Sequence, residues 1–237
     1  MSDVKYILFD LDGTLLPMDQ DVFVRAYFKL LTKKMLPYGY EAKALIDGVW
    51  AGTEAMTEND GSRTNEEAFW QRFAEFAGVN ATEDKPVFEE FYRVEFQRAA
   101  SSCGCNPEAA ATVALCRELG YRVVLAVNPL FPLSAMVSRL KWAGVDPAVF
   151  ERITSYENSS YAKPNPEYYR ELLRSLGAAP EECVMVGNDV KEDMAAETLG
   201  VRCFLLTDCL INPDHADVSR WEHGGFPLLQ NFLRNLK

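Results

Sequence analysis

The sequence is short of the features that mark zinc-binding, membrane and secreted proteins. Its only histidines, His215 and His223, have no spacing that would join Cys103 and Cys105 in a zinc site of about four ligands. It has no run of 18 apolar residues, and its first residues (MSDVKYILFD) lack a basic stretch followed by a small-residue cleavage site. We therefore expect no membrane segment, a cytoplasmic location and free thiols at the six cysteines.

Positive charge is also scarce. Lysine and arginine number 24 against 35 aspartates and glutamates, which gives a net charge of −11 at neutral pH. Nucleic acids and anionic membranes require a basic face, so we expect neither as a partner. A phosphorylated ligand would need a local source of positive potential in such a protein, and a bound cation could supply it.

The first half of the sequence predicts one strand followed by a helical block. The apolar run 6–9 is typical of a parallel strand that is covered on both faces. From about residue 22 to residue 100, apolar residues recur at helical spacing, and Thr64 with Glu67 forms a capping box at the start of one helix. We interpret the many aromatic residues of this block as packing between helices, not as a ligand site.

The second half alternates between helices and strands. The expected elements are a helix at 107–119, a strand at 121–127, a helix at 132–143, a strand at 151–155, a helix at 166–176, a strand at 183–186, a helix at 190–199 and a strand at 201–206. This alternation predicts an α/β fold with a doubly wound parallel sheet and an inserted helical domain. Ligands bind beyond the carboxyl ends of the strands in such sheets.

Polar residues follow the strands at the ends where such a site is expected. They are Asp10, Asp12, Gly13 and Thr14 after the first strand, Asn128 after the second, Lys163 beyond the third, and Asp189 and Asp193 after the fourth. Side chains two residues apart on extended chain point to the same side. One of the first two carboxylates could therefore attack an electrophile while the other transfers protons. Gly13 lets the backbone turn, and the Thr14 hydroxyl could fix that turn.

Asp189 and Lys163 determine the net charge of the predicted site. Asp189 would repel the first two carboxylates unless a cation were present, and Mg²⁺ prefers such hard oxygen ligands. Lys163 can offset the charge of a nucleophile and of a transferring phosphoryl group. Asn165 and Pro166 are expected to be the N-cap and the first residue of the following helix, which would hold the lysine loop in place.

Four of these segments, in this order, resemble the motifs of the haloacid dehalogenase (HAD) superfamily, most of whose members are phosphatases that work through an aspartyl-phosphate. "DLDGT" resembles its first motif, "VVLAVN" its second, Lys163 its third and "GNDVKED" its fourth. The helical block occupies the place of the family's C1-type cap. The resemblance implies a Rossmann-like core formed by residues 1–16 and 104–237 and a helical cap at 17–103.

The resemblance also implies a role for each motif residue. Asp10 would be the nucleophile and Asp12 the general acid and base. Asp10, Asp189 and the backbone carbonyl of Asp12 would hold Mg²⁺, with Asp193 as a further ligand or a supporting carboxylate. The residues expected to contact the phosphate or the rest of the substrate are Thr14, Asn128 and, from a loop between cap helices, Arg63.

Two positions depart from the family pattern, of which Asn188 is a benign substitute for glycine in a turn and the other bears on catalysis. The second motif normally ends in a serine or threonine that donates a hydrogen bond to the phosphoryl group, and here that residue is Val127. Loss of one such donor costs on the order of 10²-fold in rate. The leading hypothesis is a Mg²⁺-dependent phosphatase acting on a small phosphorylated metabolite. The alternatives are a phosphomutase of the same fold and a non-catalytic protein that binds a phosphorylated ligand.

Overall fold

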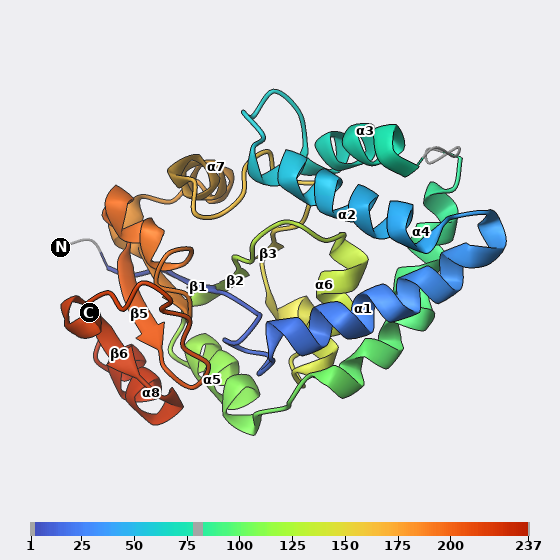
Figure 1. Ribbon diagram of the computed structural model, residues 1–237. Coiled ribbons are helices and arrows are strands. Elements are labelled where there is room, and N and C mark those ends of the chain that lie inside the picture. The colour runs from blue at the N-terminus through green and yellow to red at the C-terminus, as the bar shows by residue number, and fades with distance from the viewer. Residues whose placement is uncertain (1–2, 78–82, 237) are drawn as a thin grey trace.

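The computed structural model describes residues 3–77 and 83–236, and these form a parallel β-sheet with helices on both faces and a helical layer above it (Figure 1). The six strands lie in the order β3-β2-β1-β4-β5-β6, and every neighbouring pair is parallel. Their bounds are β1 Tyr6–Phe9, β2 Arg122–Leu125, β3 Arg152–Ile153, β4 Cys183–Gly187, β5 Arg202–Leu206 and β6 Glu222–Gly224. This architecture confirms the α/β fold with a doubly wound parallel sheet.

Both faces of the sheet are buried. In β1, Ile7 and Phe9 pack into one apolar cluster, whereas Tyr6 and Leu8 pack into another on the opposite face. The first cluster is covered by α5 (Pro107–Glu118), α6 (Leu133–Trp142) and α8 (Phe226–Arg234), and the second by α7 (Pro166–Leu176) and the 3-10 helix Met194–Leu199. Burial on both faces explains why the strands are continuous apolar runs in the sequence.

The helical layer is inserted between β1 and α5. It consists of α1 (Gln20–Met35), α2 (Ala42–Thr57), α3 (Asn65–Ala77), α4 (Lys85–Arg93) and the 3-10 helix Glu95–Ser102. Its two connections to the sheet lie side by side, because Met18 forms a β-bridge with Cys103 and the Gly104 N–H donates to the Pro17 carbonyl at 2.7 Å. In the part of the chain that the structure describes, no helix is both long enough and apolar enough to cross a membrane.

The helix starts follow the capping signals. The Thr64 N–H donates to the Glu67 carboxylate at 2.9 Å, and the Glu67 N–H donates to the Thr64 hydroxyl at 3.2 Å, so the predicted capping box is confirmed. Asn165 caps α7 by accepting a hydrogen bond from the Glu167 N–H at 3.0 Å, with Pro166 as the first helical residue. These local signals fix the direction in which each helix leaves its loop.

Two predicted elements differ markedly in the structure. The helix expected at 190–199 is a 3-10 helix over Met194–Leu199, because the Asp189 carboxylate accepts the N–H groups of Lys191 and Glu192 and holds the preceding residues in a turn. The strand expected at 151–155 is only Arg152–Ile153, which pairs on one side at the edge of the sheet.

A further difference is the C-terminal region, where β6 and α8 were not anticipated. The sequence of β6, Glu-His-Gly, carries no apolar signal, since this edge strand is defined by its backbone pairing with β5. The apolar spacing of Phe226, Leu229, Phe232 and Leu233 is helical and could have revealed α8.

Candidate active site

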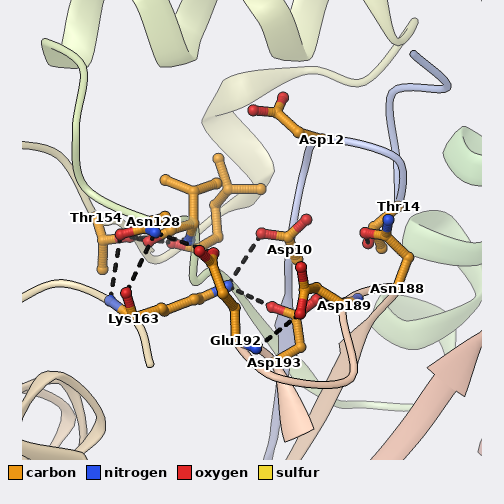
Figure 2. A network of polar contacts seen from close by, with 12 residues as sticks. Asp10, Asp12, Thr14, Asn128, Thr154, Lys163, Asn188, Asp189, Glu192 and Asp193 are labelled. Carbon is orange, nitrogen blue, oxygen red and sulfur yellow. Dashed lines mark hydrogen bonds and ion pairs between the residues drawn. The ribbon is translucent and has the colours of Figure 1, made fainter. Parts of the chain in front are cut away.

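The carboxyl ends of β1, β2 and β4 meet at one edge of the sheet. The Asp10 N–H donates to the Val186 carbonyl at 2.9 Å, and the Ala126 N–H donates to the Phe9 carbonyl at 2.7 Å, so the three strands are still paired where β1 ends. A cavity of about 270 Å³ opens there. The predicted site residues on its wall are Asp10, Asp12, Asn128, Asp189 and Asp193, joined by Glu192 (Figure 2).

Gly13 and Thr14 build the turn that follows β1. Gly13 has φ +80°, and a Cβ atom at this position would lie 2.4 Å from the Asn188 side-chain nitrogen, so only glycine fits. The Thr14 hydroxyl donates to Asn188 Oδ1 at 2.8 Å, and Asn188 in turn donates to the Cys209 carbonyl at 2.7 Å. Thr14 is buried and does not line the cavity, so its observed contact fixes the turn, as one reading of the sequence expected, and not a phosphate.

Lys163 lies beneath the cavity with no exposed side-chain surface. Its Nζ donates to Asp10 Oδ1 at 3.0 Å and to Asp193 Oδ1 at 2.6 Å. Burial by itself would lower the pKa of Lys163, but the neighbouring carboxylates of Asp10 and Asp193 outweigh it and hold the pKa well above its usual value. The lysine is therefore a permanent positive charge between two carboxylates.

Asn128 holds the lysine loop in position. Its side-chain oxygen accepts the Lys163 N–H at 3.2 Å, and its Nδ2 donates to the Glu192 carboxylate at 2.9 Å. The side-chain amide is thus already engaged. The backbone N–H of Asn128, by contrast, has no hydrogen-bond partner within residues 3–77 and 83–236. Any donor from Asn128 to a phosphoryl group would therefore be this N–H.

Two of the carboxyl groups have raised pKa values. Burial raises the pKa of Asp10 to about 7, a shift that Lys163 opposes and Asp193 reinforces. Burial likewise raises the pKa of Glu192 to about 7, again opposed by Lys163. In both groups burial is the largest effect on the pKa, and the positive charge of Lys163 offsets it only in part.

Asp12 has a partner that the sequence did not reveal. Its carboxylate forms an ion pair with Arg139 of α6, whose side chain is almost completely buried. The Arg139 guanidinium lies 5.1 Å from the ring centre of Phe23 and 5.0 Å from that of Phe131. Burial lowers the pKa of Arg139 to about 9, which leaves it charged at neutral pH. No motif marks this residue, because an arginine in an amphipathic helix is usually on the surface.

Arg63 is not brought to the site. It is exposed in the loop before α3, and its guanidinium donates to the Gln71 side chain on the same part of the helical layer. The expectation that Arg63 contacts the substrate is not supported by this arrangement. The residue of the helical layer that does line the carboxylate cavity is Gln20, the first residue of α1.

The residues expected to bind Mg²⁺ can be compared with the ligands that this ion prefers. Within residues 3–77 and 83–236, no three histidine, cysteine or acidic side chains are grouped as a metal site. The expected set needs only two carboxylates, Asp10 and Asp189, together with a backbone carbonyl. Asp189 accepts two backbone N–H groups on Oδ1, which leaves Oδ2 available. The set consists of hard oxygen atoms in a cavity of negative charge, and it fits Mg²⁺.

Asp193 is less suited to be a direct ligand. Its Oδ1 accepts Lys163 Nζ, and its Oδ2 accepts the Asp189 N–H at 2.9 Å. With both oxygens engaged and the residue only 1% exposed, its contacts position Lys163 and Asp189. Of the two roles that the sequence left open for Asp193, the geometry favours the supporting one.

The raised pKa values predict an unusual pH dependence of stability. Between about pH 4 and pH 7 the folded protein holds protons on Asp10 and Glu192 that the unfolded chain has released. Their contribution to the free energy of unfolding is therefore largest at low pH and is lost as pH rises to about 7. We expect the melting temperature in chelator to fall by about 5 °C more between pH 5 and 7.5 in the unmodified protein than in an Asp10→Asn, Glu192→Gln variant. Equal pH slopes in the two proteins would contradict these shifts.

Comparison with known proteins identifies the class. A family model described as haloacid dehalogenase-like hydrolase matches residues 4–200, so the chain belongs to the haloacid dehalogenase-like hydrolases. Phosphoserine phosphatase of Thermus thermophilus is 27% identical over 246 residues, which cover 91% of this chain and 93% of that protein. Membership of this family makes the protein a hydrolase, and phosphatases are among its relatives.

Two further comparisons concern the length of chain that is shared and the fold. Protein SUPPRESSOR OF QUENCHING 1, chloroplastic, of Arabidopsis thaliana is 23% identical over 214 residues, or 87% of this chain, but the chain spans only 18% of that protein. The crystal structure of CbbY from Rhodobacter sphaeroides in complex with phosphate has a TM-score of 0.59 at 20% identity and covers 94% of this chain and 95% of its own. The structural likeness shows a shared fold.

Proposed function

We propose that the protein is a Mg²⁺-dependent phosphatase that hydrolyses a small phosphorylated metabolite through an aspartyl-phosphate on Asp10. The observation that carries the proposal is the buried Lys163, which bridges Asp10 and Asp193 beneath a cavity whose charged wall residues are all carboxylates among the described residues. A structural ion pair would not need this excess of acid. A site that binds a cation together with a phosphate dianion does.

The reaction has two steps. A carboxylate oxygen of Asp10 attacks phosphorus, the ester P–O bond breaks, and Asp12 donates its proton to the departing oxygen. Asp12 then takes a proton from a water molecule whose oxygen attacks phosphorus. This second step releases inorganic phosphate and restores the Asp10 carboxylate and the proton on Asp12.

The remaining residues bind and orient. Lys163 holds Asp10 in place and balances its charge, and Arg139 pairs with the ionised form of Asp12, the form that accepts the proton of the water molecule in the second step. Asp10, Asp189 and the backbone carbonyl of Asp12 are the groups that would hold Mg²⁺, which supplies positive charge to a phosphate oxygen. Preorganised charge of this kind stabilises the transition state without further reorganisation.

The helical layer is proposed as a cap. Residues 17–103 would move as one unit on a core of 1–16 and 104–237, with hinges near 16–19 and 101–106. The side-by-side connections at Met18 and Cys103 support this, since two adjacent segments can bend together. Closure would exclude bulk water during phosphoryl transfer.

Phosphate release from a panel of phosphorylated metabolites tests the proposal directly. We expect turnover in Mg²⁺ and a loss of at least about 100-fold in excess chelator, because the carboxylate cavity repels a phosphate dianion when no cation is bound. Restored turnover on adding Mg²⁺ back is the control. Release that is unaffected by chelator would contradict a Mg²⁺-dependent mechanism.

Val127 favours a second candidate, a protein that binds a phosphorylated ligand without turning it over. Its side chain is 4% exposed and belongs to the apolar cluster of the sheet. Affinity for inorganic phosphate or a phosphorylated metabolite, with no release in any condition, would favour this candidate. The phosphomutase alternative would instead show transfer of the phosphoryl group to a sugar hydroxyl.

Val127→Thr separates these candidates. The Val127 N–H donates to the Thr154 hydroxyl at 3.0 Å and its carbonyl accepts from Tyr168 at 2.8 Å, so the backbone at this position is held in place. We expect kcat to rise about 10-fold or more, and the free energy of unfolding to fall by about 1–2 kcal/mol because the hydroxyl is buried. Val127→Ala, which adds no donor, is the control. A variant no faster than this control would show that the hydroxyl is not needed here.

A further inference from the structure

A second cavity, of about 180 Å³, lies between the helical layer and the loop that follows β2. Its wall is formed by α1, α2, α3 and α4 from one side, and by residues 130–132 and Tyr156 from the other. Most of the lining residues are aromatic, and none of the described residues that line it is charged. The aromatic residues do pack between helices, as the sequence interpretation has it, and rings such as Phe23 and Phe88 belong to this core and line the cavity as well.

The aromatic cavity adjoins the carboxylate cavity. Gln20, Leu130 and Phe131 line both. Phe131 also forms, with Phe23 of the aromatic wall, the two rings that flank the guanidinium paired with Asp12. The aromatic cavity is thus next to the part of the site where Asp12 lies. In the proposed reaction Asp12 protonates the leaving oxygen, so the leaving alcohol faces this cavity.

Several polar atoms of the wall are already paired, although among the described residues the buried Trp70 indole N–H has no hydrogen-bond partner. The hydroxyl groups of Tyr27 and Tyr92 hydrogen bond to each other at 3.0 Å. The Thr53 hydroxyl donates to a backbone carbonyl of its own helix at 2.9 Å. A Cβ atom on Gly52 would lie 2.5 Å from the Phe69 ring, so the glycine is what allows this ring to lie against α2. The surface offered to a ligand is therefore mostly rings and aliphatic groups.

Size and charge define the ligand. An engineered apolar cavity of about 150 Å³ admits benzene, so about 180 Å³ accommodates one aromatic ring with a short linker. A carboxylate, an amine or a second phosphate would meet no ionic partner on this wall, and burial of an unpaired charge is strongly unfavourable. Phosphoserine, phosphoglycolate and bisphosphates all carry such a group close to the phosphate that is removed.

We propose that the substrate is a phosphate monoester of an alcohol bearing an apolar, aromatic-sized group and no second ionised group near the phosphate. This inference rests on the proposed phosphatase function and specifies its leaving group. Trp50, on the cavity wall, is 51% exposed. Trp70, Phe88 and Tyr92 also line an open groove of about 690 Å³, but that groove carries charged residues as well, so the apolar group is expected to end inside the aromatic cavity.

The test compares aliphatic phosphate esters, whose leaving oxygens are similar in basicity. We expect kcat/KM in Mg²⁺ to be about 10-fold or more higher for 2-phenylethyl phosphate than for methyl phosphate, phosphoserine or phosphoglycolate, as the burial of one phenyl ring implies. Hydrolysis of methyl phosphate or phosphoserine at least as efficient as that of 2-phenylethyl phosphate would overturn the substrate class while leaving the phosphatase function intact.

Two variants on α1 test whether the preference for an apolar leaving group arises in this cavity. Val24→Phe places a ring in the cavity, whereas Val22→Phe adds the same ring at a position that is 40% exposed and outside the cavity wall. We expect the ratio of kcat/KM for 2-phenylethyl phosphate to that for methyl phosphate to fall about 10-fold in Val24→Phe and to stay unchanged in Val22→Phe. The same ratio in both variants would place the apolar selectivity elsewhere.

A binding measurement keeps the inference testable if no ester is hydrolysed, an outcome that would remove the phosphatase function itself. Trp50 and Trp70 line the cavity, so their fluorescence reports its occupation. In Asp10→Asn protein with Mg²⁺, 2-phenylethyl phosphate is expected to change this fluorescence saturably, and Val24→Phe is expected to weaken the binding about 10-fold. No saturable change, or a change that Val24→Phe leaves untouched, would overturn the aromatic subsite.

Discussion

Asp10→Asn is expected to reduce kcat for phosphate release by about 10⁴-fold or more, because an amide cannot form the covalent bond to phosphorus that the proposed mechanism requires. Asparagine has nearly the same shape and keeps an oxygen that can accept the hydrogen bond from Lys163. We therefore expect the variant to remain folded. The measurement is steady-state phosphate release with the best substrate of the panel in saturating Mg²⁺.

The matched control is Asp214→Asn, which removes a carboxylate from an exposed loop and is expected to leave kcat unchanged within about twofold. Quenched wild-type reactions should also contain protein with one phosphoryl group on the peptide that carries Asp10, and the variant should not. An Asp10→Asn protein that retained more than a few per cent of wild-type kcat would exclude Asp10 as the nucleophile.

Lys163→Met is expected to destabilise the protein by about 3–5 kcal/mol and to abolish turnover. The substitution keeps an unbranched side chain of similar length but leaves Asp10 and Asp193 buried without their common partner. The free energy of unfolding would be measured by urea titration in chelator, so that bound Mg²⁺ does not mask the loss.

A second pair of variants separates charge from packing. Lys191→Met removes an exposed lysine from the loop after β4 and should change the free energy of unfolding by less than about 0.5 kcal/mol. Adding Asp193→Asn to Lys163→Met should recover part of the lost stability, since one unpaired carboxylate is removed with its partner. If Lys163→Met were as stable as Lys191→Met, the buried network would not have the energetic role that its geometry indicates.

The sequence was informative where structure is local. The β1 strand is a short apolar run, and the caps at Thr64 and Asn165 are defined by residues within three positions of each other. The alternation of helices and strands then predicts the parallel sheet, because right-handed crossovers leave few other arrangements. Given that sheet, Asp10 and Asp189 had to meet at its carboxyl edge, although their catalytic roles stay predictions.

The sequence was uninformative where contacts are made between distant segments. Arg139 pairs with Asp12 across 127 positions, and nothing in its own helix distinguishes it from a surface arginine. Glu192 lies between Asp189 and Asp193 and has no role assigned from the sequence, yet it accepts a hydrogen bond from the Asn128 amide. Conversely, the loop position of Arg63 favours a contact with the substrate, but in the structure its guanidinium donates a hydrogen bond to Gln71 within the helical layer. Such assignments depend on which faces pack together.

What the sequence determined by itself is therefore the fold, the family and the edge of the sheet at which the chemistry is expected, since hydrophobic period, capping and chain order are encoded within short windows. The tertiary structure alone decided which residues of the site form hydrogen bonds and ion pairs with one another. It turned the Asn128 amide toward the lysine loop, engaged both oxygens of Asp193, and left an uncharged aromatic cavity beside Asp12. The reason is physical: hydrogen-bond partners and cavity walls are supplied by residues that only the packing of the cap on the sheet brings together.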